Sequence, residues 1–216
     1  MSNRKVPFVT GEFYHIYNRG NDKRKIFHNL EDYKRFIALL YISNSSRNFA
    51  LRDVSKNIFD FECGETLVSI GSYSLMPNHF HILLTPTRDD LVAKFMQKLT
   101  TAYSMYYNIK YNRTGTLFEG RYKSEHTRHD KHLKYLFSYI NLNPLKLFDK
   151  NFKEKGFKTS EISLKAFKEY EFSSYIDLSS HARKENKIID LKAFPSYFQF
   201  KKDFKKEILS WINFSE

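Results

Sequence analysis

The chain has 216 residues, which is enough for one substantial hydrophobic core or for a compact domain with an appendage. Lys and Arg outnumber Asp and Glu by 36 to 24, and the net charge of +12 favours a polyanionic partner, with nucleic acid as the first candidate. The single cysteine, Cys63, excludes an intrachain disulfide and a zinc site built from cysteines. No stretch approaches about 18 consecutive apolar residues, so we expect a cytoplasmic protein without membrane contact.

The first half of the chain alternates predicted strands and helices. Residues 12–17 are rich in aromatic and β-branched side chains and predict a strand, and Asn29 is the expected N-cap of a following helix. Segment 43–64 has mixed polarity and is interpreted as a variable connection. Residues 67–76 and 79–85 predict two more strands joined by a short turn.

The pattern continues with a helix, a strand and a further helix. Apolar residues at helical spacing predict an amphipathic helix from Asp89 or Asp90 to just before Asn112. Residues 116–125 predict a fourth strand, and Asp130 is expected to cap the next helix. The order β-α-β-β-α-β predicts an α+β fold of the ferredoxin-like type, a split β-α-β antiparallel sheet backed by helices. The helix after Asp130 is an addition to that plan.

Two histidines in the predicted strand 79–85 share one face. Alternate side chains of a strand point the same way, so His79 and His81 project together while Phe80 points into the core. Two adjacent imidazoles provide half of a metal site. Such a pair is weak evidence by itself, because most histidines in strands serve packing.

A tyrosine and an amide lie four residues apart in the helix after Asp130. Tyr139 and Asn143 therefore share one helical face, at the edge of the apolar stripe. Pro144 disfavours helical dihedrals at Asn143, so we expect the helix to end there and the amide to project from its last turn. An amide oxygen beside two imidazoles suits Mg²⁺ or Mn²⁺. Together with the basic charge, these residues suggest nucleophilic attack on a phosphodiester at a metal ion.

The other histidines considered are not predicted to be metal ligands. His15, on the first strand, is expected to be a half-buried sheet residue. His126, His129 and His132 are interpreted as surface or phosphate-contacting residues and not as metal ligands.

Three segments are similar, in the same order, to the signature motifs of one family. They are MPNHFHILL at 76–84, NRTGTLFEGRYK at 112–123 and YINLNPLK at 139–146. The chain thus resembles the single-tyrosine transposases of the HUH endonuclease superfamily, which contain the insertion sequence 200-like transposase domain. It is most similar to the branch of REP-associated tyrosine transposases. Residues 14–20 and 172–175 extend the similarity from residue 8 to about residue 176.

Two positions depart from the family pattern. Phe118-Glu119 stands where the family commonly has Trp-Gln, and Phe172 stands where Trp is usual. Phe118-Glu119 keeps an aromatic residue followed by a polar one, and Phe172 keeps an aromatic residue. We therefore expect the chemistry to be retained.

The resemblance implies roles for individual residues. It places the catalytic tyrosine at Tyr139 and the ligands of a divalent ion, Mg²⁺ or Mn²⁺, at His79, His81 and Asn143. Such a tyrosine attacks a phosphate of single-stranded DNA and leaves a 5′-phosphotyrosine and a free 3′-OH. The implied partner is single-stranded DNA with hairpins or palindromic repeats, and relatives are monomers or homodimers.

The remaining expectations concern DNA contacts and domain limits. We expect a catalytic domain at residues 1–150 and a basic C-terminal extension at 151–216, packed on that domain or following it. Five basic residues in turns or on element faces near the proposed site are candidates for phosphate contact: Arg19, Lys98, Arg113, Arg121 and Lys123. Two alternatives remain open: a catalytically silent nucleic-acid-binding protein of the same fold, and a metal-dependent nuclease in which water attacks.

Overall fold

The computed structural model describes residues 7–49, 58–149, 160–180 and 183–213. The first part contains, in order, β1 (Phe13–Arg19), α1 (Leu30–Ile42), β2 (Val68–Met76), β3 (His79–Pro86), α2 (Leu91–Lys110) and β4 (Lys123–Thr127). The four strands form one antiparallel sheet in the order β2-β3-β1-β4. This arrangement confirms the predicted α+β fold with a split β-α-β sheet.

The second part is helical. It contains α3 (Asp130–Leu142), α4 (Leu145–Phe148), α5 (Glu161–Lys168), α6 (Tyr175–Ser179) and α7 (Lys201–Asn213), with 3-10 turns before α7 at Lys184–Ile188 and Leu191–Ala193. The domain boundary expected at residue 150 falls in segment 150–159, outside the described residues. No helix in the described parts of the chain combines the length and apolar character needed to cross a membrane.

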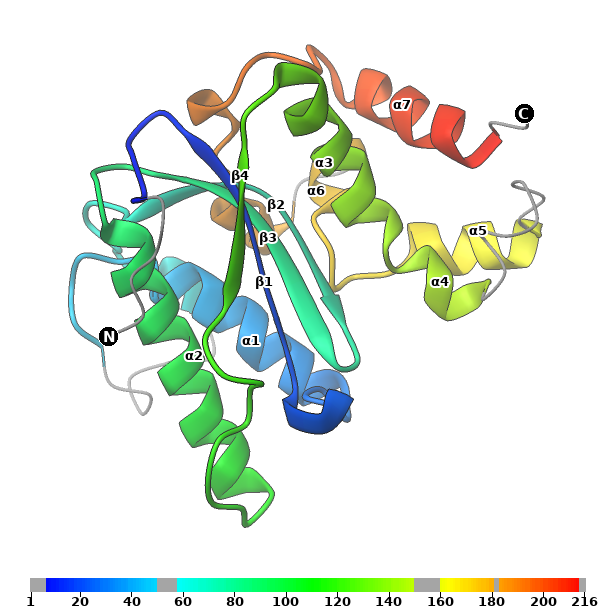
Figure 1. Ribbon diagram of the computed structural model, residues 1–216. Helices are drawn as coiled ribbons and strands as arrows, with labels where there is room; N and C mark the ends of the chain where they lie inside the picture. The colour runs from blue at the N-terminus through cyan, green and yellow to red at the C-terminus, as the bar shows by residue number, and fades with distance from the viewer. Residues whose placement is uncertain (1–6, 50–57, 150–159, 181–182, 214–216) are drawn as a thin grey trace.

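The two faces of the sheet are covered by different helices (Figure 1). Phe80 and Ile82 of β3 point into a core cluster shared with α1 and α2. Leu83, on the opposite side of the strand, belongs to a second cluster with α3 and with C-terminal residues such as Phe167 and Phe204. Because side chains alternate along β3, His79 and His81 lie on the face that α3 covers.

Some element limits differ from those predicted. The fourth strand begins at Lys123 and not at residue 116, because Gly120 adopts a positive φ of 68° that interrupts an extended chain. Asp130 is the first residue of α3, while His129 occupies the N-cap position. The Asp130 carboxylate instead accepts a hydrogen bond of 2.5 Å from the Tyr197 hydroxyl.

Two further expectations concern α1 and the connection after it. Asn29 caps α1 as expected, accepting a hydrogen bond from the amide of Asp32 at 3.2 Å. The described part of connection 43–64 contains a short 3-10 turn, Ile58–Asp60, and residues 50–57 lie outside the described residues.

Candidate active site

Strand register aligns polar side chains in rows on the sheet face that α3 covers. His81 on β3 lies opposite Tyr17 on β1, and Tyr17 lies opposite Lys123 on β4. In the next row His79 lies opposite Arg19. Opposed residues of antiparallel strands point to the same side of the sheet, so these five side chains share one face. The ring centroids of His79 and His81 are 5.0 Å apart.

A pocket of about 320 Å³ opens between this sheet face and α3. Its lining residues come from β1, β3, β4 and α3: His15, Tyr17, His81, Glu125, His132, Tyr135, Leu136 and Tyr139. The Tyr139 ring meets the rings of His81 and His15 edge-on, with centroids 5.9 Å and 6.0 Å away. The fold thus brings the predicted nucleophile and one predicted metal ligand, about 60 residues apart in sequence, to one pocket.

His15 lies deeper than the sequence suggested. It is 4% exposed, and not half-buried, and its Nε2 is 2.9 Å from Nδ1 of His81. Glu125 approaches the other ring nitrogen of His15, with Oε2 at 3.9 Å from Nδ1. His15 therefore orients His81, a part that sequence analysis missed. The available signal was the alternation of His15 with Tyr17, but it becomes informative only once the register of β1 against β3 is known.

The two predicted histidine ligands are held neutral. Burial lowers the pKa of His79 to about 4, with the charges of Lys146 and Arg19 adding to the effect. Burial also lowers the pKa of His81 well below its usual value, assisted by His15, His79 and Lys146. A neutral imidazole is the form that binds a metal ion, so both rings are ready for that role at neutral pH.

Asn143 ends α3 differently from the prediction. It follows the last residue of the helix but keeps right-handed helical dihedrals, φ −52° and ψ −41°, despite Pro144. The chain continues through Pro144 into α4, and the Asn143 amide N–H still donates to the Tyr139 carbonyl at 3.2 Å. The side chain does not project freely: its Nδ2 donates to the Tyr139 carbonyl at 2.9 Å, and its Oδ1 accepts from Lys146 Nζ at 2.8 Å.

The donor set fits a divalent ion at the histidine pair. Nδ1 of His79 is 2.7 Å from Asn78 Oδ1, and Nδ1 of His81 contacts His15. Engagement of one ring nitrogen is typical of metal-binding histidines, because it fixes the tautomer and directs the other nitrogen to the metal. Within the described residues, no group of three or more His, Cys, Asp or Glu side chains is arranged to hold a metal. The oxygen of Asn143, predicted as the third ligand, accepts a hydrogen bond from Lys146 Nζ at 2.8 Å.

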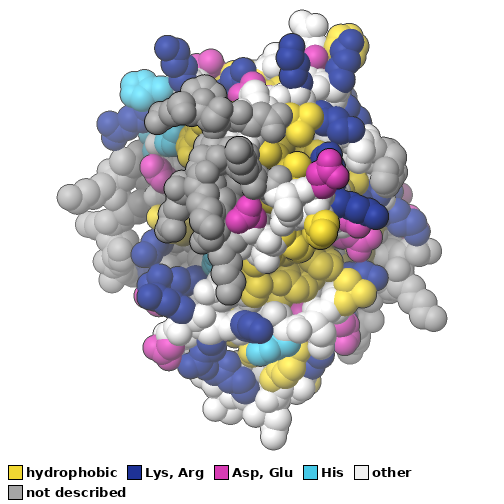
Figure 2. All heavy atoms as spheres, turned by 90° about the vertical axis from the view of Figure 1, so that its right-hand side faces the viewer, with side chains coloured by type: hydrophobic (Ala, Val, Ile, Leu, Met, Phe, Trp, Pro, Cys, Tyr) yellow, Lys and Arg dark blue, Asp and Glu magenta, His cyan; other side chains and the backbone are white. Residues whose placement is uncertain are grey.

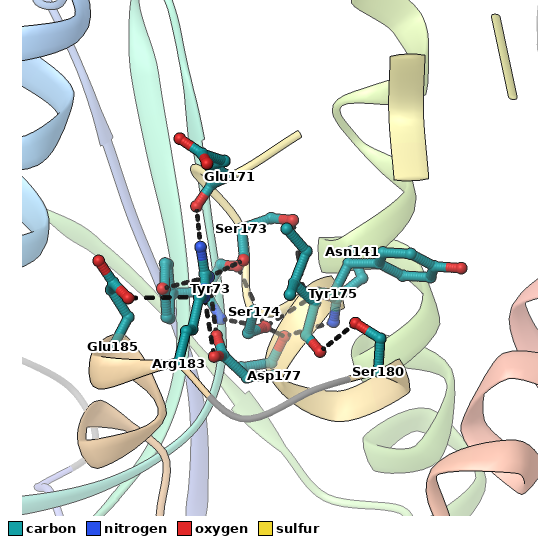
Figure 3. Close-up of polar contacts among 12 residues, drawn as sticks. Tyr73, Asn141, Glu171, Ser173, Ser174, Tyr175, Asp177, Ser180, Arg183 and Glu185 are labelled. Atoms are coloured by element: carbon teal, nitrogen blue, oxygen red, sulfur yellow. Dashed lines mark hydrogen bonds and ion pairs between the residues drawn. The ribbon is translucent and has the colours of Figure 1, made fainter. Parts of the chain in front are cut away.

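A buried polar network fixes α3 against the sheet (Figure 3). Asn141 donates from Nδ2 to Ser72 Oγ on β2 at 2.8 Å and accepts at Oδ1 from Ser174 Oγ at 2.9 Å. The Tyr73 amide donates to Ser174 Oγ at 3.0 Å. Asn141, Ser72 and Ser174 are each 0% exposed. This network joins α3 to β2 two residues after Tyr139. Sequence analysis missed it, although a polar Asn141 within an apolar stripe was a signal.

An adjacent ion pair holds the chain segment that supplies Ser174. Arg183 donates to both carboxylate oxygens of Asp177, at 2.9 Å and 2.8 Å, and to the carbonyls of Ser173 and Glu171, at 2.8 Å and 2.6 Å (Figure 3). Asp177 is 3% exposed, so the pair is largely withdrawn from water. The C-terminal residues are thus part of the support for α3.

The predicted phosphate-contacting residues divide into two groups. Arg19, which forms an ion pair with Glu119, lies in the row of His79. The exposed Lys123 lies on the edge strand β4, and the exposed Arg121 precedes that strand by two residues. Lys98 and Arg113 are not brought to the pocket.

Lys98 and Arg113 belong to the other side of the molecule. Lys98 lies on α2, across the sheet, and its ammonium donates to the carbonyls of Ser45 and Arg47 at 2.5 Å and 2.9 Å. The Arg113 guanidinium lies over the Tyr107 ring, 5.7 Å from its centroid. Lys98 lies across the sheet from the pocket, a position that was not predicted because sequence does not reveal which sheet face a helix covers. A phosphate contact by Lys98 or Arg113 stays a prediction.

Comparison with known families matches residues 9–143 to the family described as Transposase IS200 like. The chain belongs to the IS200-like transposase family. This match confirms the predicted family, whose members are enzymes and are generally metal-dependent. The match contains His79, His81, Tyr139 and Asn143.

No curated protein matches the chain. Among solved structures, the chain is similar to one described as "Structure of the REP associates tyrosine transposase bound to a REP hairpin". The two share 14% identity with a TM-score of 0.43, and the similarity covers 68% of this chain and 74% of that one.

Proposed function

We propose that this transposase-family chain cleaves and rejoins single-stranded DNA, with Tyr139 as the nucleophile. The observation that supports the proposal most directly is the position of the Tyr139 ring, 5.9 Å from that of His81 across one pocket. A tyrosine that served packing alone would have no need of neutral imidazoles beside it. The membership of the chain in a transposase family supports the same reading.

In the proposed reaction, the Tyr139 oxygen attacks a DNA phosphorus atom. A new bond forms between that oxygen and phosphorus, and the bond from phosphorus to the 3′ oxygen breaks. The phenol loses its proton and the departing 3′ oxygen gains one, so the products are a 5′-phosphotyrosine and a free 3′-OH. Because phenolate is an acceptable leaving group, a 3′-OH can later reverse the step and rejoin the strand.

A divalent ion, Mg²⁺ or Mn²⁺, is the proposed cofactor. His79, His81 and Asn143 would hold it, and when bound it supplies polarisation of the attacked phosphate. His15 contributes by fixing the ring of His81 through the 2.9 Å contact between their nitrogens. Asn143 ties this site to the nucleophile, because its side chain bonds the carbonyl of Tyr139.

The proposed substrate is single-stranded DNA next to a hairpin. Arg19 and Lys123 share the sheet face of the histidines, and Arg121 comes two residues before Lys123; these three are the proposed phosphate contacts. Binding through phosphates should weaken steeply with salt. Titrations at several salt concentrations with a hairpin bearing an unpaired flank and with plain duplex test this substrate, and equal affinity for both would contradict the single-strand preference.

The deciding experiment compares the wild type with Tyr139→Phe on a denaturing gel. The substitution removes only the nucleophilic oxygen, so DNA binding should survive while the slowly migrating protein–DNA adduct disappears. Tyr122→Phe is the matched control, because Tyr122 stacks on Phe8, at 6.5 Å between ring centroids, away from the pocket. Cleavage by the wild type without an adduct would favour a hydrolytic nuclease, and binding without cleavage would favour a silent DNA-binding protein.

A further inference from the structure

We infer that Trp211 and Tyr135 form a stacking platform for an unpaired base of the DNA strand that enters the pocket of Tyr139. The inference rests on the proposed function and assigns a role to α7. Three rings follow one another: the Trp211 centroid is 5.4 Å from that of Tyr135, and the Tyr135 centroid is 5.8 Å from that of Tyr139. Tyr135 and Tyr139 both line the pocket. A nucleotide adjacent to the attacked phosphate would therefore meet Tyr135 and then Trp211.

The two platform rings remain accessible although their neighbours are buried. Along α7, Phe204, Ile208 and Ile212 are each at most 1% exposed, whereas Trp211 is 37% exposed. Tyr135 is 39% exposed. Packing of the C-terminal region therefore buries only part of each ring. The exposed part of each ring can contact a ligand.

Hydrogen bonds fix the orientation of Trp211. Its indole N–H donates to Glu207 Oε1 at 3.0 Å, and Glu207 Oε2 lies 3.1 Å from Lys134 Nζ on α3. Lys134 is the residue before Tyr135, so this bridge sets α7 against the part of α3 that holds the platform. A ring that is held before binding loses little conformational freedom when a base stacks on it.

The surroundings favour an unpaired nucleotide as the occupant. Lys131 is exposed one helical turn before Tyr135, on the same face of α3. Exposed lysines on the other sides of α7 add to the positive charge of the region: Lys201, Lys202, Lys205 and Lys206. On the face that carries α4, α5 and α7, hydrophobic side chains gather beside Lys and Arg side chains (Figure 2). Aromatic rings beside positive charge are the combination that binds single strands, since phosphates meet the charge and bases stack on the rings. Bases within a duplex are already stacked on each other and cannot reach the platform.

The single tryptophan of the chain makes the platform directly observable, because all tryptophan fluorescence comes from Trp211. The measurement uses the full chain with Tyr139→Phe, which prevents turnover during titration. A single-stranded oligonucleotide should quench the fluorescence of Trp211 in step with binding measured by anisotropy of a label on the DNA. A duplex of the same sequence should produce little quenching.

Substitutions then measure what the ring contributes. Trp211→Leu keeps an apolar side chain but removes the aromatic face, and it should weaken single-strand binding about tenfold. Trp211→Phe keeps an aromatic face and should retain most of the parent protein's affinity for single-stranded DNA. Phe200→Leu is the matched control, because Phe200 is 60% exposed and lies eleven residues earlier, at the other end of α7. It should bind as tightly as the parent protein.

Three results would overturn the platform. One is unchanged Trp211 fluorescence when anisotropy shows saturation with single-stranded DNA. The second is equal affinity of Trp211→Leu and the parent protein. The third is a fluorescence change that depends on protein concentration without DNA, which would identify a second copy of the chain as the occupant. If one of these results is found while the wild-type chain, with Tyr139 intact, still forms its adduct with single-stranded DNA, the proposed function stands and only the platform is wrong.

Discussion

Nε2 of His15 lies 2.9 Å from Nδ1 of His81, and this contact decides which nitrogen of His81 is left for a ligand. Only Nε2 of His81 remains available, and it lies on the sheet face that α3 covers. The contact links β1 to β3 at the level of Tyr139, whose ring stands edge-on to both imidazoles.

The first prediction concerns metal binding. His81→Ala should abolish Mn²⁺ binding and DNA cleavage while circular dichroism shows an intact fold, because the side chain points away from the cluster of Phe80 and Ile82. His15→Gln should weaken Mn²⁺ affinity about 10- to 100-fold, because it disturbs a group that orients a ligand. Calorimetric titration measures both. Full activity of His81→Ala, or cleavage undiminished by excess chelator, would refute the metal role.

The second prediction concerns stability in acid. Burial, helped by the charge of His132, lowers the pKa of His15 from its ordinary value of 6.5 to about 4. The unfolded chain therefore binds a proton that the folded chain resists, so stability is full above the unfolded pKa and is lost as the pH falls towards the folded value. His15 alone should reduce the free energy of unfolding by about 2 kcal/mol between about pH 8 and about pH 5.

Urea titrations of the metal-free protein across that pH range measure this loss. In the His15→Gln variant, the unfolding free energy should decrease less over this pH range, because the contribution of His15 protonation is absent. Identical pH dependence in the two proteins would show that His15 is protonated as easily in the folded chain as in the unfolded one.

Local patterns in the sequence predicted much of the site. Alternation in a strand placed His79 and His81 on one face, and helical spacing placed Tyr139 beside Asn143. Strand register and helix placement were not predictable, because both depend on contacts between distant segments. That is why His15 was read as an ordinary sheet residue and Lys98 was expected on the wrong side of the molecule.

The third prediction concerns Lys146, whose ammonium donates a hydrogen bond to Asn143 Oδ1, the oxygen proposed to bind the metal ion. Lys146 Nζ donates to Asn143 Oδ1 at 2.8 Å and lies 5.8 Å from the centroid of the Tyr139 ring. A positive charge here competes with a divalent cation. Lys146→Met should therefore bind Mn²⁺ several-fold more tightly than the wild type in calorimetric titration at fixed salt. Lys165→Met, on the exposed side of α5, removes the same charge elsewhere and should leave the affinity unchanged.

Weaker Mn²⁺ binding by Lys146→Met would contradict this competition. It would show instead that the lysine holds Asn143 in the orientation that the ion requires.

The last prediction concerns Asn141, which joins the helix of Tyr139 to β2. Asn141→Leu has nearly the same size but leaves the hydroxyls of Ser72 and Ser174 without their amide partner in a fully buried place. Loss of such partners costs about 1–3 kcal/mol of unfolding free energy. Because α3 is then less firmly placed, formation of the covalent adduct should slow.

Ser138 provides the control on the same helix. It is 0% exposed, and its hydroxyl has no hydrogen-bond partner among the described residues. Ser138→Ala therefore removes a buried polar atom that forms no bond, and it should be neutral or slightly stabilising. Urea titration and single-turnover adduct formation compare the two variants. If Asn141→Leu matches Ser138→Ala in both measurements, the network does not position the nucleophile, and the placement of α3 must come from its apolar contacts alone.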